Sequence, residues 1–224
     1  MTINIKTEVQ SIKESIIANR RDFHMHPELG FEEIRTSKII AEKLSSYGLD
    51  VETNIGKTGV VATLKGLSDG KTIALRADMD ALPIQEIGDL SYKSVNDGVM
   101  HACGHDGHIS MLLGAAKILS SMKNKINGTV KFIFQPAEEG GGGARYMIED
   151  SVLDGVDEIY GAHLWNYQKY GTIGVKSGPI MAAADLFEII IEGKGGHGAT
   201  PHGTVDAIIV ASQVIQSLQT IVSR

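Results

Sequence analysis

Residues 106–134 read DGHISMLLGAAKILSSMKNKINGTVKFIF, and this stretch decides the predicted fold. Its first part, 106–121, has apolar residues at helical spacing, whereas 129–134 is a short apolar run typical of a buried strand. Further strands are predicted at 60–64, 72–77 and 158–162, and further helices at 4–23, 32–47 and 145–149. Strands that alternate with helices predict an α/β layer architecture.

The composition changes near 177–179, where a second region begins. It is predicted to hold a strand at 185–192, a loop rich in Gly and His at 193–203, and a helix at 205–222. A strand, a loop and a helix are too few elements for a stable domain. We therefore expect one domain over 1–178 and the incomplete beginning of a second over 179–224.

The composition is that of an ordinary globular protein, with 42% apolar and 21% charged residues among 224. A net charge of −6 and the lack of a dense Lys/Arg run argue against binding to nucleic acid or to a membrane surface. No apolar run approaches the roughly 20 residues that span a bilayer, and the N-terminus does not resemble a secretory signal. With a single cysteine as well, the sequence predicts a cytoplasmic protein.

The segment 101–108, HACGHDGH, gathers one thiol, three imidazoles and a carboxylate just before a predicted helix. Gly104 lets Cys103 and His105 converge on one ion, and thiolate and imidazole are both good ligands for borderline divalent metals. The alternative is a buried cysteine among ordinary core or surface histidines. The clustering of ligand types favours a metal site or a catalytic role.

The segment 135–139, QPAEE, places Glu138 and Glu139 directly after the strand predicted at 129–134. Active sites of α/β proteins often form at such strand ends. Adjacent residues there point in different directions, so one carboxylate could bind metal while the other remains free as a base. A solvated acidic turn is the alternative.

Two further histidines lie in positions where they could complete a site. His163 follows the strand predicted at 158–162, where a histidine is either structural or an additional metal ligand. His197 lies in the glycine-rich loop 195–202 and could stabilise an oxyanion, although a flexible polar loop is an equal alternative.

Asp78 and Asp80 are two residues apart after a strand, so their side chains share a face. One of them could orient a metal-binding histidine, whereas a turn-forming aspartate before a proline is the alternative. The segment 23–30 carries His24 and His26, whose chemistry is ambiguous and consistent with a helix end before proline.

Together, the segments 23–33, 76–83, 100–108, 134–140 and 195–202 resemble the signatures of the M20 metallopeptidase family. They are most similar to its amidohydrolase branch, which includes N-acyl-amino-acid amidohydrolases, hippurate hydrolases, auxin-conjugate hydrolases and N-acetyldiaminopimelate deacetylases. The resemblance implies a zinc-peptidase-like α/β catalytic domain with helices around a mixed sheet. It also implies a smaller α+β lid domain through which the enzyme forms homodimers.

The resemblance further implies roles for six of the candidate residues. Two divalent ions, manganese or zinc with cobalt or nickel as substitutes, would be held by Cys103, His105, Glu139 and His163. Glu138 would be the general base, and His197 would assist at the oxyanion. For Asp78 and Asp80, their spacing alone leads us to expect that they orient a ligand histidine without binding the metal.

The implied reaction is hydrolysis of the amide bond of small-molecule N-acyl-L-amino acids by a metal-activated water. One alternative is a dipeptidase or aminopeptidase of the same family. Another is a truncated, catalytically silent fragment, because family members return after the lid to a last metal-binding histidine that this chain lacks.

Overall fold

The structure is a computed structural model that describes residues 4–183 and 185–223. The helices are α1 (Ile5–Met25), α2 (Ile34–Ser46), α3 (His105–Ser121), α4 (Gly143–Glu149) and α5 (Ala207–Ser223), with short 3-10 helices η1 (Lys123–Lys125) and η2 (Pro201–Gly203). The strands are β1 (Asp50–Ile55), β2 (Gly59–Lys65), β3 (Ser68–Asp78), β4 (Asn127–Gln135) and β5 (Glu158–Gly161).

The five strands form one mixed sheet in the order β1-β2-β4-β3-β5. β2 pairs antiparallel with β1 and β4, whereas β3 pairs parallel with both β4 and β5. The carboxyl ends of β3, β4 and β5 therefore meet at one edge of the sheet. Ligand sites of α/β proteins commonly form outside this edge.

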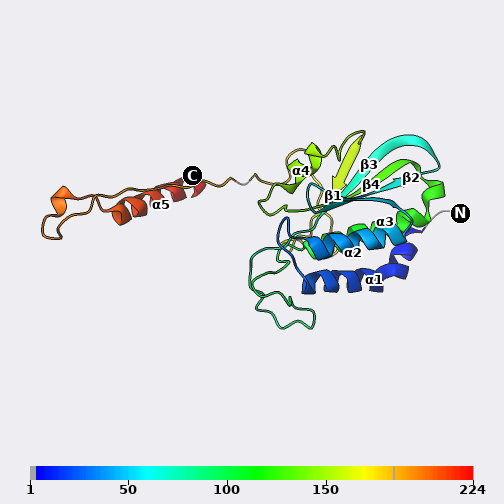
Figure 1. Ribbon diagram of the computed structural model, residues 1–224, viewed down its shortest axis with the longest axis horizontal. Helices are drawn as coiled ribbons and strands as arrows, with labels where there is room; N and C mark the ends of the chain where they lie inside the picture. The colour runs from blue at the N-terminus through cyan, green and yellow to red at the C-terminus, as the bar shows by residue number, and fades with distance from the viewer. Residues whose placement is uncertain (1–3, 184, 224) are drawn as a thin grey trace. The chain divides into compact units, whose positions relative to one another are not determined.

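Alternating residues of the central strands supply two apolar layers. Phe132 and Phe134 of β4 pack on the side covered by the larger helices, whereas Ile133 packs with Met147 of α4 on the opposite side. Figure 1 shows α1, α2 and α3 lying together on one side of the sheet. This arrangement confirms the predicted α/β class with helices around a mixed sheet.

Helix α3 lies in the middle of the larger helical layer, between the sheet and α1. Its side chains Ile109, Leu113 and Ala116 are completely buried. A helix that is apolar on nearly every side is held by packing all around. Its first residue, His105, is therefore fixed in position close to the carboxyl edge of the sheet.

Most elements lie within a few residues of their predicted bounds, and two differ. Strand β1 was not predicted, because most of its side chains are exposed and it lacks an apolar alternation. The strand predicted at 185–192 is wrong, because no strand is formed there. A strand needs a neighbour to pair its N–H and C=O groups. In the described part of this region, the pairing between Lys194 and Val205 is a single isolated bridge.

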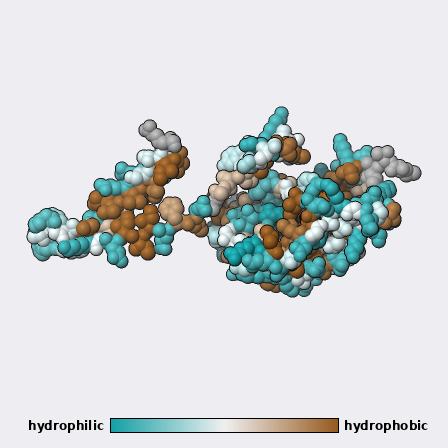
Figure 2. Space-filling view, turned by 90° about the horizontal axis from the view of Figure 1, so that it is seen from above, coloured by the Kyte–Doolittle hydropathy of each residue, from teal (hydrophilic) through white to brown (hydrophobic). Residues whose placement is uncertain are grey.

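The chain divides into two compact units, Met1–Lys169 and Tyr170–Arg224. The predicted domain boundary between 178 and 179 stays a prediction. Apolar side chains gather on the surface of the second unit, among them Ile208, Ile215 and Ile221 of α5 (Figure 2). Within the described residues, no helix combines the length and the apolar character needed to cross a membrane.

Candidate metal centre

The candidate residues of the first unit converge at the carboxyl edge of the sheet. Asp78 is the last residue of β3, Glu138 and Glu139 follow β4, and His163 follows β5. Cys103 and His105 come to the same place from the start of α3. The parallel pairing of the three strands brings these distant segments together.

His105 lies at the centre of the cluster and is completely buried. Its Nδ1 lies 3.4 Å from Asp80 Oδ1, and its Nε2 lies 3.8 Å from Glu139 Oε1 and 3.9 Å from Glu138 Oε2. A carboxylate behind Nδ1 favours a proton on that nitrogen and leaves the lone pair of Nε2 directed at the cluster. Asp80 thus lies where an orienting carboxylate was predicted.

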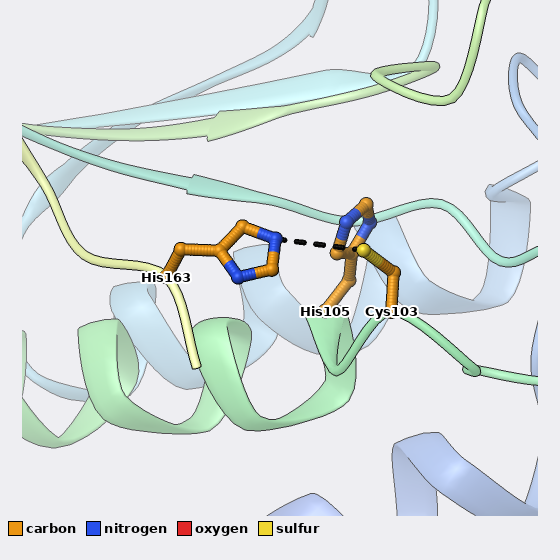
Figure 3. A group of neighbouring side chains, drawn as sticks. All are labelled: Cys103, His105 and His163. Atoms are coloured by element: carbon orange, nitrogen blue, oxygen red, sulfur yellow. Dashed lines mark hydrogen bonds between the residues drawn. The ribbon is translucent and has the colours of Figure 1, made fainter. Parts of the chain in front are cut away.

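Cys103 and His163 are in direct contact, with 3.4 Å between Sγ and Nε2. Figure 3 shows the imidazole of His163 directed at the sulfur, with the ring of His105 beside it. His163 Nδ1 donates to its neighbouring carbonyl, Leu164 O, at 2.6 Å, so its Nε2 carries a lone pair. Gly104 adopts a φ of +88°, which a residue with a side chain rarely takes, and this turn presents both Cys103 and His105 to the cluster.

The two glutamates are exposed to different degrees although they are adjacent. The side chain of Glu138 is 43% exposed and that of Glu139 is 24% exposed. Glu139 is anchored through its backbone, because its N–H donates to Asp80 Oδ2 at 2.9 Å. Asp80 therefore accepts a hydrogen bond from the glutamate turn with Oδ2, while its Oδ1 lies 3.4 Å from His105 Nδ1.

Of the histidines near Asp78, His108 is the closest. The sequence placed His108 in the 101–108 cluster but predicted no role for it individually. Asp78 Oδ1 accepts from His108 Nδ1 at 2.6 Å, and its Oδ2 accepts from Arg76 at 2.7 Å. His108 Nε2 accepts from the N–H of Leu164 at 2.9 Å. Since both ring nitrogens are engaged, His108 supports the segment that carries His163. This role could have been suspected from the sequence, because His108 lies three residues after His105 and therefore on the same side of the predicted helix.

The electrostatics of the site favour a bound cation. Burial opposes ionisation of Asp78, but the His108 hydrogen bond and the charges of His105 and Arg76 outweigh it and lower the pKa of Asp78 to about 2. Burial, contact with Glu139 and nearby negative charge raise the pKa of the Cys103 thiol to about 12. A cation would offset the excess negative charge and stabilise the thiolate.

The residues present fit a divalent metal ion. Three overlapping groups bring possible ligand atoms within 4.8 Å of one another: Cys103–His105–His163, Asp78–His105–His108 and His105–Glu138–Glu139. Neither ring nitrogen of the buried His105 has a hydrogen-bond partner among the described residues. A buried, unpartnered imidazole next to sulfur and oxygen donors is suited to metal coordination.

His197, the remaining candidate, belongs to the second unit. Its Nδ1 accepts from the N–H of Ala199 at 3.1 Å, which fixes the imidazole within the loop 195–202. This contact neither supports nor contradicts the role predicted for His197.

The fold and the cluster define the class: an α/β protein with a candidate metal centre at the carboxyl edge of a mixed sheet. The chain belongs to the peptidase family M20/M25/M40, whose sequence profile matches residues 74–221. This confirms the family indicated by the sequence motifs.

Two curated relatives illustrate the membership. An N-acyl-L-amino acid amidohydrolase of Geobacillus stearothermophilus is 52% identical over 221 residues, which are 98% of this chain and 60% of the relative. An N-acetylcysteine deacetylase of Bacillus subtilis is 50% identical over 93% of this chain and 55% of the relative. The chain thus spans little more than half the length of these relatives.

Solved structures share the fold. A putative aminohydrolase of methicillin-resistant Staphylococcus aureus matches with a TM-score of 0.82 and 43% identity, over 98% of this chain and 59% of that one. A Bacillus subtilis peptidase of the M20 family, described as binding a dinuclear metal, matches with a TM-score of 0.73 and 47% identity over 76% of this chain and 48% of that one.

Proposed function

We propose that this chain supplies most of the active site of a metal-dependent amidohydrolase that cleaves N-acyl-L-amino acids. The observation that carries the proposal is the convergence of Cys103, His105, Glu139 and His163 beside an accessible second carboxylate, Glu138. Relatives named N-acyl-L-amino acid amidohydrolase and N-acetylcysteine deacetylase support the choice of an amide substrate.

In this proposal, two divalent ions are held with the help of Cys103, His105, Glu139 and His163. Bound divalent ions make a water molecule acidic and polarise the acyl carbonyl. Manganese and zinc suit the mixed donor set, and cobalt or nickel can substitute. The dinuclear description of a Bacillus subtilis relative supports the number of ions.

Glu138 is proposed as the general base. It lies next to the ligand Glu139 and close to His105, yet its side chain remains 43% exposed and able to reach a substrate. Its carboxylate would accept a proton from the attacking water and return it to the leaving amine. The products are a carboxylic acid and a free amino acid.

His197 is proposed to donate a hydrogen bond to the oxyanion that develops on the acyl oxygen. It would act from a lid domain that begins near 179 and through which two copies of the complete protein associate. The glycine-rich surroundings of His197, at 195, 196 and 198, allow a backbone to pass close to a substrate.

The exchange of Glu138 for Gln tests the base directly. In the protein expressed from its complete reading frame, Glu138→Gln should retain metal but lose at least about 10³-fold in kcat, because proton transfer is removed without a change of shape. Hydrolysis of N-acetyl amino acids and the metal content are measured together.

The matched control is Glu139→Gln, which should lose metal as well as activity because Glu139 is the proposed ligand. Turnover at the wild-type rate by Glu138→Gln would remove Glu138 from the mechanism. Loss of metal in both variants would instead show that the two glutamates share one role.

A peptidase is the second candidate function, because a relative named thermostable carboxypeptidase 1, from Saccharolobus solfataricus, is 48% identical over 98% of this chain. Comparison of kcat/KM for N-acetyl amino acids, N-blocked dipeptides and free dipeptides separates the possibilities. Preference for a free amino group would favour a dipeptidase or aminopeptidase, and preference for blocked dipeptides a carboxypeptidase.

A further inference from the structure

Glu33 is a carboxylate with no exposure to solvent, and neither the metal centre nor the proposed reaction uses it. Glutamate is almost never fully buried unless it is paired. Its partners are hydrogen-bond donors: Thr58 Oγ1 donates to Oε2 at 2.5 Å, and the N–H of Ala137 donates to Oε1 at 2.8 Å. Burial raises the pKa of Glu33, which means that keeping its charged form inside the fold costs folding free energy.

The side chain of Glu33 does not serve its own helix. Glu33 is the N-cap residue of α2, yet its side chain makes no capping hydrogen bond. The N–H groups of Arg35 and Thr36, in the first turn of α2, donate to the carboxylate of Glu28 at 2.9 and 2.8 Å. Because Glu28 caps the helix, Glu33 is left to reach Ala137, 104 residues further along the chain.

Ala137 holds a backbone conformation that it would not adopt by preference. Its φ is +47°, in the left-handed region that costs a residue with a side chain about 1–2 kcal/mol. The residue is completely buried, and a Cβ placed on Gly30 would lie only 2.9 Å from Ala137 Cβ. Gly30 and Glu33 thus fix this turn by close packing and by a hydrogen bond.

We propose that Glu33 is a positioning residue that sets the orientation of the Glu138–Glu139 turn. The inference rests on the function proposed above for these two glutamates. Side chains hold the backbone on either side of Glu138: the N–H of Ala137 donates to Glu33, and the N–H of Glu139 donates to Asp80. The carbonyl of Ala137 also accepts from the N–H of Gly143 at 3.1 Å, so Glu33 is the side chain that fixes the N–H side of this residue. Glu138 lies between the two residues held by side chains, so the loss of the hydrogen bond to Glu33 allows Ala137 to relax and rotates the peptide that carries the base.

Three substitutions of Glu33 and one control test this role in the protein expressed from its complete reading frame. Glu33→Leu removes the acceptor, and Glu33→Asp retains a carboxylate but shortens its reach by one methylene. Glu33→Gln retains an oxygen for Ala137 and presents an amide N–H₂ to the Thr58 hydroxyl. The control Glu28→Leu removes a carboxylate from the same segment, which weakens the cap of α2 but leaves the turn untouched.

Kinetics should separate positioning from stability. Glu33→Leu and Glu33→Asp should lose about 100-fold in kcat, with KM and metal content changed by less than about twofold, because a shift of the base impairs the chemical step. Glu33→Gln should restore kcat to within about fivefold of wild type. Glu28→Leu should lower Tm and leave kcat unchanged.

Amide hydrogen exchange over 136–142 gives a second readout that does not depend on activity. Exchange at Ala137 should be faster in Glu33→Leu and Glu33→Asp than in wild type and Glu33→Gln. If Glu33→Leu does not fold, the Asp variant decides. If wild type hydrolyses no amide, the proposed function fails, while exchange still decides whether Glu33 holds the turn.

Three results would overturn the proposal. The first is a folded Asp or Leu variant with wild-type kcat. The second is wild-type exchange at Ala137 in both variants. The third is a Gln variant as impaired as Leu.

Discussion

Cys103 is the side chain whose chemistry depends most on a bound cation. Without one, burial and the adjacent glutamates keep its thiol protonated, with a pKa of about 12. Metal binding would therefore release a proton and form a metal–thiolate bond. The sulfur also contacts His163 Nε2 at 3.4 Å, so the two proposed ligands are already adjacent.

Cys103→Ala should lower cobalt affinity by at least about 100-fold, since loss of a direct ligand should cost no less than loss of an outer partner. The thiolate-to-cobalt charge-transfer band should disappear with it. Titration with Co²⁺, followed by absorbance, measures both effects. A variant with unchanged stoichiometry and an unchanged band would exclude Cys103 as a ligand.

A second buried network lies at the end of α1. His24 is 2% exposed, with Nδ1 2.8 Å from Asp106 and Nε2 3.3 Å from Glu86. Arg20 also pairs with Asp106, and the ring of Tyr92 packs edge-on against the imidazole. The hydrogen bond to Asp106 outweighs burial and raises the pKa of His24 above its ordinary 6.5.

The raised pKa predicts how stability depends on pH in the metal-free protein. The charged His24 stabilises the fold fully below pH 6.5, and this contribution is lost as the pH rises through the raised pKa. His24→Gln should remove this dependence and cost about 2 kcal/mol at low pH, the scale of a charged hydrogen bond. Urea unfolding with a chelator present, from acid to alkaline pH, provides the measurement.

His26→Gln is the matched control, because it removes a second imidazole from the same helix end without touching Asp106 or Glu86. The wild-type pH dependence should persist in this variant. The assignment to His24 would be wrong if the unfolding free energy of the control also stopped depending on pH. It would also be wrong if His24→Gln kept the wild-type dependence.

At the scale of elements, the turn into α3 brings Cys103 and His105 to the metal centre. Gly104, at φ +88°, makes that turn, and a Cβ added there would still be 3.6 Å from Leu164. Space is therefore sufficient, and the obstacle to a larger residue is the backbone conformation. The glycine at position 104 is therefore what allows the chain to turn into α3 at this point.

Gly104→Ala should cost about 1–2 kcal/mol in unfolding free energy and also weaken cobalt binding, because relief of the strain moves Cys103 relative to His105. Gly98→Ala is the control, since Gly98 has a φ of +74° and an added Cβ there would have no atom of the described residues within 4 Å. The control should lose similar stability with unchanged cobalt affinity. Equal cobalt affinity in both variants would show that the turn does not set the ligand geometry.

The elements that the sequence predicted well are those with an apolar period. Helix α3 and strand β4 bury most of their side chains, so their patterns are clear. β1 is mostly exposed and gives no such pattern. The segment 185–192 has the composition of a strand, but strand formation depends on a partner that composition does not reveal.

The candidate site was predictable by residue type but not by orientation. Cys103, His105 and Glu139 stand out because several ligand types cluster in short segments. The choice of Asp80 as the carboxylate next to His105 Nδ1, and the hydrogen bond from Ala137 to Glu33, depend on how the helices and loops pack around the sheet. Such contacts join segments far apart in the chain, and no local pattern encodes them.

At the scale of the whole molecule, the two units carry different parts of the proposed chemistry. The unit Met1–Lys169 contains all four proposed ligands, of which His163 is the last in the chain, and the five-stranded sheet. The unit Tyr170–Arg224 carries His197 and many exposed apolar side chains, such as Leu186 and Ile208. Exposed apolar surface of this kind marks contact with other protein segments or a liability to aggregate.

A chain that ends at Lys169 should therefore keep cobalt affinity within about threefold of the 224-residue chain, because no proposed ligand is removed. It should also bind far less of an apolar fluorescent dye, since the exposed apolar surface of the second unit is gone (Figure 2). Cobalt titration and dye fluorescence are compared at equal concentration, with circular dichroism to confirm folding. Weak cobalt binding by a folded shorter chain would mean that a residue after 169 is also a ligand, with His197 and His202 the first to substitute.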